Sequence, residues 1–161
     1  MDAVFLGLGS NLGDRRENLR RALEMLGSHI SISKKSSVYE SEAMYVRQPR
    51  FYNMVVAGTT TLLPLQLLGR LKSIEESMGR EQNTHNLPRP IDIDIIFYGD
   101  MVIESPELTI PHPRMHERPF VLSPLVELDP YLVHPHLQQP VIDLEDNLGI
   151  SDDIIWKVDE L

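Results

Sequence analysis

The 161-residue sequence contains no cysteine and few basic residues. Without cysteine there is no disulfide bond and no thiolate metal site, and nothing indicates secretion. Only 15 lysines and arginines stand against 24 acidic residues, which gives a formal net charge of -9. This surplus of negative charge argues against a broad surface that binds nucleic acid or a membrane.

A membrane-spanning run is missing as well. The apolar stretch 3–8 is far too short to cross a bilayer, and it lacks the basic start of a signal peptide. We therefore expect a cytoplasmic protein with no membrane partner and no nucleic-acid partner. If the protein binds a phosphate group, a few local arginines and a metal ion must hold it, because the net charge opposes such binding.

The spacing of the apolar residues predicts alternating strands and helices within one domain, residues 1–161. Strand, helix, strand, strand, helix and strand are indicated in that order at residues 3–8, 18–26, 30–39, 52–61, 64–78 and 92–98. This β-α-β-β-α-β order predicts an α+β fold, a ferredoxin-like sandwich. The proline-rich chain after Tyr98 contains one short helix, at 120–128, and we expect this C-terminal extension to wrap the sheet.

Asp92 and Asp94 are the most informative residues, because they alternate with Ile91, Ile93 and Ile95. This period directs the isoleucines to a core and places both carboxylates on the other strand face, roughly 6–7 Å apart. Two like charges this close need a compensating cation, and Mg²⁺ prefers carboxylates combined with substrate phosphates. The pattern favours a phosphoryl-transfer site. A solvated strand face with two ordinary aspartates is the alternative.

A polar loop leads into this strand and carries an arginine at each end. It begins at Gly79-Arg80 and ends at Pro88-Arg89-Pro90. The two prolines stiffen the backbone around Arg89, and a guanidinium group matches phosphate oxygens. The loop therefore has the features of a lid over an anionic ligand. The simpler alternatives are a plain surface loop and a salt bridge from Arg89 to the nearby aspartates.

The segment Gly7-Leu8-Gly9-Ser10-Asn11-Leu12-Gly13 invites comparison with the dinucleotide-binding fingerprint. The match fails, because the third glycine comes one position late and the following strands are not in the order of a doubly wound sheet. We instead expect the glycines to form a tight strand-to-helix turn, with Asp14 as the cap of the helix.

Five motifs along the chain together carry a family resemblance. They are Gly7-x-Gly9-Ser10-Asn11-x-Gly13, Phe51-Tyr52-Asn53, Gly79-Arg80, Pro88-Arg89-x-Ile91-Asp92-Ile93-Asp94-Ile95, and Leu108-Thr109-Ile110-Pro111-His112-Pro113 followed by Arg118-x-Phe120. In this order, from about Val4 to Pro130, they resemble the 6-hydroxymethyl-7,8-dihydropterin pyrophosphokinase family of folate biosynthesis. The resemblance implies an enzyme that uses Mg²⁺ to transfer the β,γ-diphosphate of ATP to the hydroxymethyl group of the pterin, with release of AMP.

The resemblance also implies roles for individual residues. The catalytic group comprises Arg80, Arg89, Asp92 and Asp94, of which the two aspartates hold two Mg²⁺ ions. The ATP-binding residues are Arg80, Arg89, His112 and Arg118. The pterin-binding residues are Phe51 and Phe120, which stack on the ring, with Asn53, Met44 and Glu75. Without the resemblance, the simpler interpretation is that the histidine packs between prolines and both phenylalanines lie in the core.

The 79–90 loop departs from the family pattern, because it is slightly shorter and less basic than in better-known members. A non-catalytic ferredoxin-like module that binds a nucleotide or a pterin is therefore the alternative function. Magnesium-dependent release of AMP separates the two functions. We expect a monomer, and we interpret the pair His112 and His116 and the pair His134 and His136 as structural rather than as metal sites.

Overall fold

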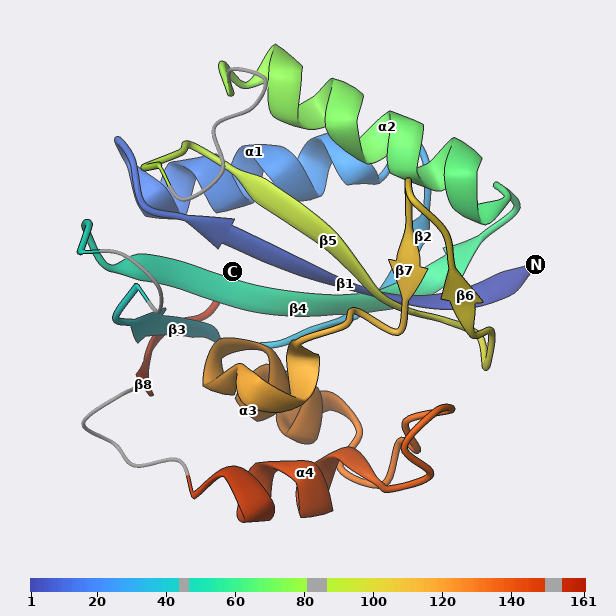
Figure 1. Ribbon diagram of the computed structural model, residues 1–161. Coiled ribbons are helices and arrows are strands. Elements are labelled where there is room, and N and C mark those ends of the chain that lie inside the picture. Colours follow the sequence, from blue (N-terminus) through green and yellow to red (C-terminus); the bar gives the residue numbers. More distant parts are fainter. Residues whose placement is uncertain (44–46, 81–86, 150–154) are drawn as a thin grey trace.

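The computed structural model describes residues 1–43, 47–80, 87–149 and 155–161 (Figure 1). Its helices are α1 (Arg15–Leu26), α2 (Pro64–Ser77), α3 (Pro119–Leu128) and α4 (Val141–Leu148), with a 3-10 turn at Met115–Glu117. Its strands are β1 (Asp2–Ser10), β2 (Ser31–Lys35), β3 (Val38–Ser41), β4 (Phe51–Thr60), β5 (Asp92–Tyr98), β6 (Ile103–Glu104), β7 (Thr109–Ile110) and β8 (Ile155–Asp159). The predicted α+β class is confirmed.

An antiparallel sheet of six strands forms the centre of the molecule. Its order is β5-β1-β4-β3-β8, and β2 pairs with the second half of β4. Helices α1 and α2 cover one face of the sheet, and α3 and α4 cover the other (Figure 1). Because β1 lies between β5 and β4, residues far apart in the sequence become neighbours across it.

Each face of the sheet carries its own hydrophobic core. The core under α1 and α2 combines alternate strand residues with the apolar stripes of both helices, including Val4, Leu6, Leu8, Leu19, Ala22, Leu26, Leu67, Leu71, Ile74, Ile91, Ile93 and Ile95. The core under α3 and α4 includes Val55, Ile96, Phe97, Val121, Leu122, Leu125, Val141 and Leu144. The predicted burial of the isoleucines around Asp92 and Asp94 is confirmed, so these carboxylates belong to the α3 face.

The first two helices begin at the predicted cap and at the predicted proline, although α1 (Arg15–Leu26) starts before the predicted range 18–26. The Asp14 carboxylate accepts a hydrogen bond from the backbone N–H of Glu17 at 3.1 Å, which satisfies a donor that the helix leaves free. Helix α2 begins at Pro64. Proline is favoured at this position, because a backbone N–H in the first turn has no acceptor within the helix. The sequence signals for both helix starts are therefore confirmed.

Two predictions about the backbone are wrong. The strand expected over 30–39 is interrupted, because Ser36 donates its N–H to the Val55 carbonyl at 2.9 Å and accepts the Val55 N–H with its hydroxyl at 2.9 Å. A side chain thus replaces a backbone acceptor and separates β2 from β3. Gly7 and Gly9 lie inside β1 rather than in a turn. Of the three glycines of the motif, Gly13 alone makes the left-handed turn, with φ 76°.

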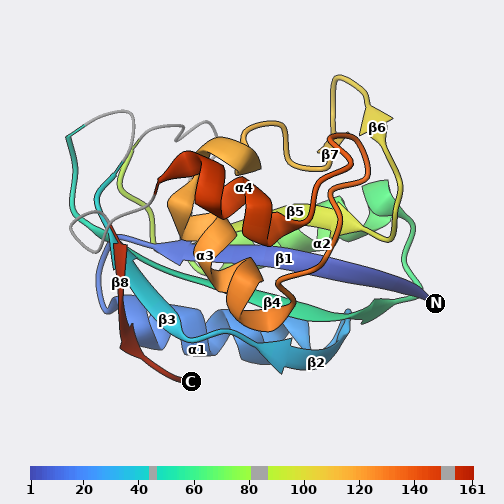
Figure 2. The same ribbon diagram turned by 90° about the horizontal axis from the view of Figure 1, so that it is seen from below.

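The C-terminal part contains the predicted short helix, α3, and several elements that sequence reasoning did not predict. After β5 the chain makes the small β6–β7 hairpin, and α3 and α4 then lie together over the sheet (Figure 2). Strand β8 pairs with β3 at the edge of the sheet. Within the described residues, no helix is both long enough and apolar enough to cross a membrane.

Candidate active site

Strand pairing places Asp92, Gly9 and Asn53 in one row across the sheet. Gly9 pairs with Asp92 of β5 on one side and with Asn53 of β4 on the other. Gly7 pairs in the same way with Asp94, one row further along β5. Asp92 and Asp94 are called the acid pair below. Because neighbouring strands lie about 4.8 Å apart, the acid pair and Asn53 are about 10 Å apart on the sheet face that α3 covers.

The two glycines let neighbouring side chains pack directly onto the backbone of β1. A Cβ on Gly9 would lie 2.7 Å from Oδ1 of Asn53, and a Cβ on Gly7 would lie 3.3 Å from Cδ1 of Ile96. The first distance is too short for any side chain, so glycine is required for Asn53 to lie across β1.

Arg80 lies against the acid pair just beyond the C-terminal end of α2. Its Nη1 donates to Oδ1 of Asp92 at 2.8 Å and to Oε2 of Glu75 at 2.8 Å. Glu75 also accepts the backbone N–H of Ile93 at 2.8 Å. Burial raises the pKa of Glu75 to about 7 against the opposing effects of the Ile93 N–H and Arg80, and the Asp92 charge raises it too. Two acidic side chains thus share one guanidinium group.

His112 and Arg118 face the second carboxylate of the pair. His112 Nε2 lies 4.0 Å from Oδ2 of Asp94, and Arg118 Nη1 lies 3.4 Å from the same Nε2. Burial and the charge of Arg118 lower the pKa of His112 to about 4, so the ring is neutral. The Arg114 N–H donates to Nδ1 at 3.3 Å, whereas Arg118 Nη1, which can only donate, lies beside Nε2, so the two contacts favour opposite tautomers of the neutral ring. Burial also raises the pKa of Asp94, and the neighbouring Asp92 adds to this.

Arg89 is a buried cation, with only 9% of its surface exposed. The central carbon of its guanidinium group lies 5.6 Å from the centre of the Phe51 ring. Its Nε is buried and has no hydrogen-bond partner among the described residues. Because a buried donor without an acceptor costs free energy, this atom points to an anionic ligand that supplies the acceptor.

Each phenylalanine that the resemblance assigns to the pterin has an arginine beside it. The guanidinium carbon of Arg118 lies 5.6 Å from the centre of the Phe120 ring, the same distance that separates Arg89 from Phe51. Both phenylalanines are only partly buried, so each keeps ring surface for a ligand. A guanidinium group therefore lies beside each of the two phenylalanine rings.

Asn53, Met44 and Glu75 complete the predicted pterin residues. Asn53 is 5% exposed, and its Nδ2 donates to Oγ of Ser41 at 2.9 Å, which fixes the orientation of the amide. Met44 lies outside the described residues. Glu75 contacts Arg80 beside the acid pair. Of these three residues, Asn53 lies in β4 with Phe51 and in the same row as Asp92 across β1.

The acid pair has the donor chemistry for Mg²⁺ if phosphate oxygens complete the coordination. The described residues contain no group of three or more His, Cys, Asp or Glu that could hold a metal ion alone. Mg²⁺ usually binds through one or two carboxylates together with substrate phosphates. Asp92 and Asp94 supply two such carboxylates from one face of β5, so the residues present fit this kind of site.

His134 has a structural role. Its Nδ1 accepts the backbone N–H groups of His136 at 3.2 Å and Leu137 at 3.0 Å. The neutral ring therefore carries its proton on Nε2, which leaves no free lone pair for a metal ion. The ring also packs edge-on against Phe97, with 5.7 Å between the ring centres.

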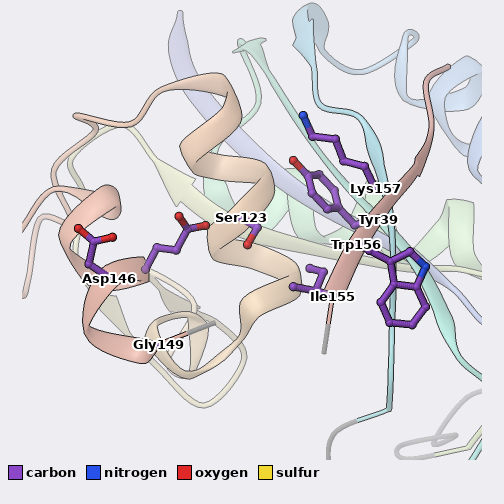
Figure 3. Close-up of a pocket in the computed structure, with 8 residues that line it drawn as sticks. Tyr39, Ser123, Asp146, Gly149, Ile155, Trp156 and Lys157 are labelled. Carbon is purple, nitrogen blue, oxygen red and sulfur yellow. The ribbon is translucent and has the colours of Figure 1, made fainter. Parts of the chain in front are cut away.

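A separate cavity of about 550 Å³ lies between α4 and β8 (Figure 3). Its lining residues are Tyr39, Ser123, Glu145, Asp146, Gly149, Ile155, Trp156 and Lys157. The Tyr39 hydroxyl donates to Glu127 at 2.6 Å, and Lys157 Nζ lies 3.6 Å from the same carboxylate. None of the predicted site residues lines this cavity, so it is not part of the candidate active site.

Sequence reasoning missed the contribution of Gly7 and Gly9 to the site. A signal was present, because two glycines two residues apart in a strand share one face and leave it without side chains. The comparison with a nucleotide-binding turn directed attention to backbone freedom instead. In this structure the glycines allow the Asn53 side chain to lie close to the backbone of β1.

Comparison with known proteins finds several relatives of this chain. A family model described as 7,8-dihydro-6-hydroxymethylpterin-pyrophosphokinase matches residues 5–130. A protein of Aquifex aeolicus named 2-amino-4-hydroxy-6-hydroxymethyldihydropteridine pyrophosphokinase is 42% identical over 142 residues, which cover 88% of this chain and 89% of that protein. A Bacillus subtilis protein with the same name is 42% identical over 128 residues, covering 78% of this chain and 77% of its own length.

Other relatives are longer than this chain. A folate synthesis bifunctional protein of Arabidopsis thaliana is 48% identical over 130 residues, but these cover only 27% of that protein. The crystal structure of Plasmodium falciparum HPPK-DHPS superimposes with a TM-score of 0.76 over 91% of this chain and 45% of that one. Its sequence is 20% identical, so it supports the fold alone. From the family model and the two bacterial relatives, the chain belongs to the 7,8-dihydro-6-hydroxymethylpterin-pyrophosphokinase family.

Proposed function

We propose that this protein transfers the diphosphate of ATP to 6-hydroxymethyl-7,8-dihydropterin, with release of AMP, in a magnesium-dependent reaction. The observation that carries the proposal is the row Asp92–Gly9–Asn53. It brings Asp92 and Asn53 to opposite sides of Gly9, so a carboxylate and an amide lie two strand spacings, about 10 Å, apart on one face of the sheet. The strand order also supports the ferredoxin-like description of the first six predicted elements, with the C-terminal part wrapping the second face.

The phosphate end of this site is built from cations and carboxylates. Arg80 and Arg89 supply guanidinium groups, and the unsatisfied Nε of Arg89 has a hydrogen to donate to a phosphate oxygen. Asp92 and Asp94 would hold the Mg²⁺ ions. Bound there, Mg²⁺ neutralises phosphate charge and orients the phosphates.

His112 and Arg118 complete the contacts with ATP. Because His112 is neutral, its ring can offer one N–H to a phosphate oxygen without adding charge. Arg118 lies beside it and adds the charge. In this reaction the protein holds the attacking and leaving groups in line and neutralises developing charge, and no covalent intermediate with the protein is needed.

The pterin end combines two aromatic faces with one fixed amide. Phe51 and Phe120 would stack on the ring, which adds about 0.5–1.5 kcal/mol for each aromatic pair beyond the burial of area. Asn53 offers both a donor and an acceptor to the edge of the ring. Glu75 and Met44 belong to the boundary of this region in the proposal, and Glu75 reaches it through its contact with Arg80.

The test is AMP formation from ATP and Mg²⁺ with and without 6-hydroxymethyl-7,8-dihydropterin, resolved by chromatography. Pterin-dependent AMP with a matching amount of pterin diphosphate is the expected result. Pterin binding in calorimetry without any AMP would overturn the proposal in favour of a non-catalytic binding module. Removal of Mg²⁺ with a chelator should abolish AMP formation, and its addition should restore it.

A further inference from the structure

Asn11 is a buried residue that the proposed reaction does not yet use. It follows the last residue of β1 and is 2% exposed. Its side chain is an amide, which can accept with Oδ1 and donate twice with Nδ2. In this structure Oδ1 accepts one hydrogen bond and Nδ2 donates two, and the partners come from two segments, one around Arg89 and one just before Phe51.

The first set of contacts fixes the backbone of Arg89. Asn11 Oδ1 accepts the backbone N–H of Arg89 at 2.8 Å, and the backbone N–H of Asn11 donates to the Arg89 carbonyl at 3.1 Å. Pro88 and Pro90 have no N–H, so the Arg89 N–H is the only backbone donor in this tripeptide. Asn11 therefore holds both polar backbone groups of the residue that carries the buried guanidinium group.

The second set of contacts fixes the chain that leads into Phe51. Asn11 Nδ2 donates to Oε1 of Gln48 at 2.9 Å and to the carbonyl of Pro49 at 3.1 Å. Strand β4 begins at Phe51, two residues later. The Phe51 ring in turn lies 5.6 Å from the Arg89 guanidinium carbon, so the contacts form a closed ring through Asn11.

We propose that Asn11 is a positioning residue that sets the distance between the phosphate-binding Arg89 and the ring-binding Phe51. The inference rests on the proposed function, because that function gives these two residues their ligands. One rigid amide bonded to both segments fixes their separation more tightly than two independent loops would. Correct separation matters because transfer requires the diphosphate and the hydroxymethyl oxygen to meet in line.

Three variants test the proposal. Asn11→Ala removes the side-chain bonds to both segments, and Gln48→Ala removes one bond on the Phe51 side only. Asn18→Ala is the matched control, because Asn18 Nδ2 ties the same turn through Ser10 Oγ at 3.2 Å and the Leu12 carbonyl at 2.8 Å without touching either segment. Each variant is titrated by calorimetry with the pterin and with Mg²⁺ and α,β-methylene-ATP, and kcat and KM are measured for both substrates.

The expected pattern is selective. Asn11→Ala, which loses three side-chain hydrogen bonds, should weaken both ligands about five- to tenfold and lower kcat, an effect about as large as the net contribution of one hydrogen bond. Gln48→Ala should weaken the pterin about two- to fivefold and leave ATP binding unchanged. Asn18→Ala should bind both ligands within about twofold of the wild type, since a change of this size corresponds to less than one hydrogen bond.

Two results would overturn the proposal. One is Asn11→Ala with wild-type affinity for both ligands, and the other is Asn18→Ala with the same losses as Asn11→Ala. If Asn11→Ala does not fold, the affinities of Gln48→Ala test the proposal instead. The Gln48 side chain is only partly buried, and its removal leaves the hydrogen bond between Arg89 and Asn11 in place. A wild-type protein that forms no AMP contradicts the proposed reaction, whereas the calorimetric pattern still tests the position of Asn11.

Discussion

Gly9 and Asn53 lie opposite each other in β1 and β4, and a Cβ on Gly9 would come within 2.7 Å of Oδ1 of Asn53. The Asn53 amide therefore lies directly over the glycine backbone, while its Nδ2 is held by Ser41. A side chain at residue 9 would compete with Asn53 for this space. The absence of a side chain at Gly9 is thus a condition for the position of the amide.

We expect Gly9→Ala to raise the KM for the pterin at least about tenfold, because the new methyl group must displace Asn53 and with it two or more hydrogen bonds to the ring. ATP binding should change little. Calorimetry with each ligand separates the two effects. Gly7→Ala is the control, because its Cβ would meet the Ile96 side chain, with Cδ1 at 3.3 Å and Cγ1 at 3.7 Å, and not Asn53. Equal losses of pterin affinity in both variants would contradict this explanation.

Asp94→Asn should lower AMP release at least about 100-fold without lowering thermal stability. The Asp94 side chain is 41% exposed, so its charge adds little to the stability of the metal-free protein, although desolvation and the charge of Asp92 raise its pKa. The amide removes that charge and keeps the shape. AMP release and the Tm of metal-free protein at pH 8 are the measurements. Asp100→Asn, in the exposed turn after β5, is the control, and an active Asp94→Asn protein would disprove the metal assignment.

The strand that carries the acid pair was predictable from local sequence. Alternation of isoleucine with aspartate around Asp92 and Asp94 requires only the period of a strand, and the burial of Ile93 and Ile95 agrees with it. Helix α1 was predictable for the same reason, since its cap and its apolar spacing lie within one short segment. Local sequence patterns therefore predicted which residues lie on each face of the strand that carries Asp92 and Asp94, and they predicted the α+β class.

The row that joins the acid pair to the amide was not predictable from local sequence. It depends on the register of β1 against both β5 and β4, and no short segment encodes a register between distant strands. The break at Ser36 escaped notice for a related reason, because a serine hydroxyl that replaces a ladder acceptor looks like any strand residue until Val55 is opposite it. Asn11 could be recognised as a motif member, but its partners could not.

Arg89→Lys should weaken the binding of Mg²⁺ and α,β-methylene-ATP about tenfold or more. Lysine keeps the positive charge but lacks Nε and the planar fork that matches phosphate oxygens. The buried Nε of Arg89 has no partner among the described residues, so its loss should not lower the Tm of the free protein. Calorimetry and a thermal melt measure the two quantities. Unchanged affinity in Arg89→Lys would show that the site needs only charge at this position.

His134 should make the protein less stable in acid. Burial and the charges of His116 and His136 lower the pKa of His134 to about 4, whereas an unfolded histidine titrates near 6.5. Between these values the unfolded chain binds the extra proton, so the free energy of unfolding falls as the pH drops from about 6.5 to 4, by up to about 3 kcal/mol in all. Above pH 6.5 this contribution is constant.

His134→Asn removes the titration but keeps an acceptor for the backbone N–H groups that Nδ1 now binds. We expect its free energy of unfolding, measured by urea denaturation at several pH values, to fall less in acid than that of the wild type. His134→Phe also cannot titrate, but it leaves those two donors without an acceptor, so it should be less stable at pH 8 and show the same reduced loss of stability below pH 6.5 as His134→Asn. A wild-type slope in both variants would mean that another group causes the acid sensitivity.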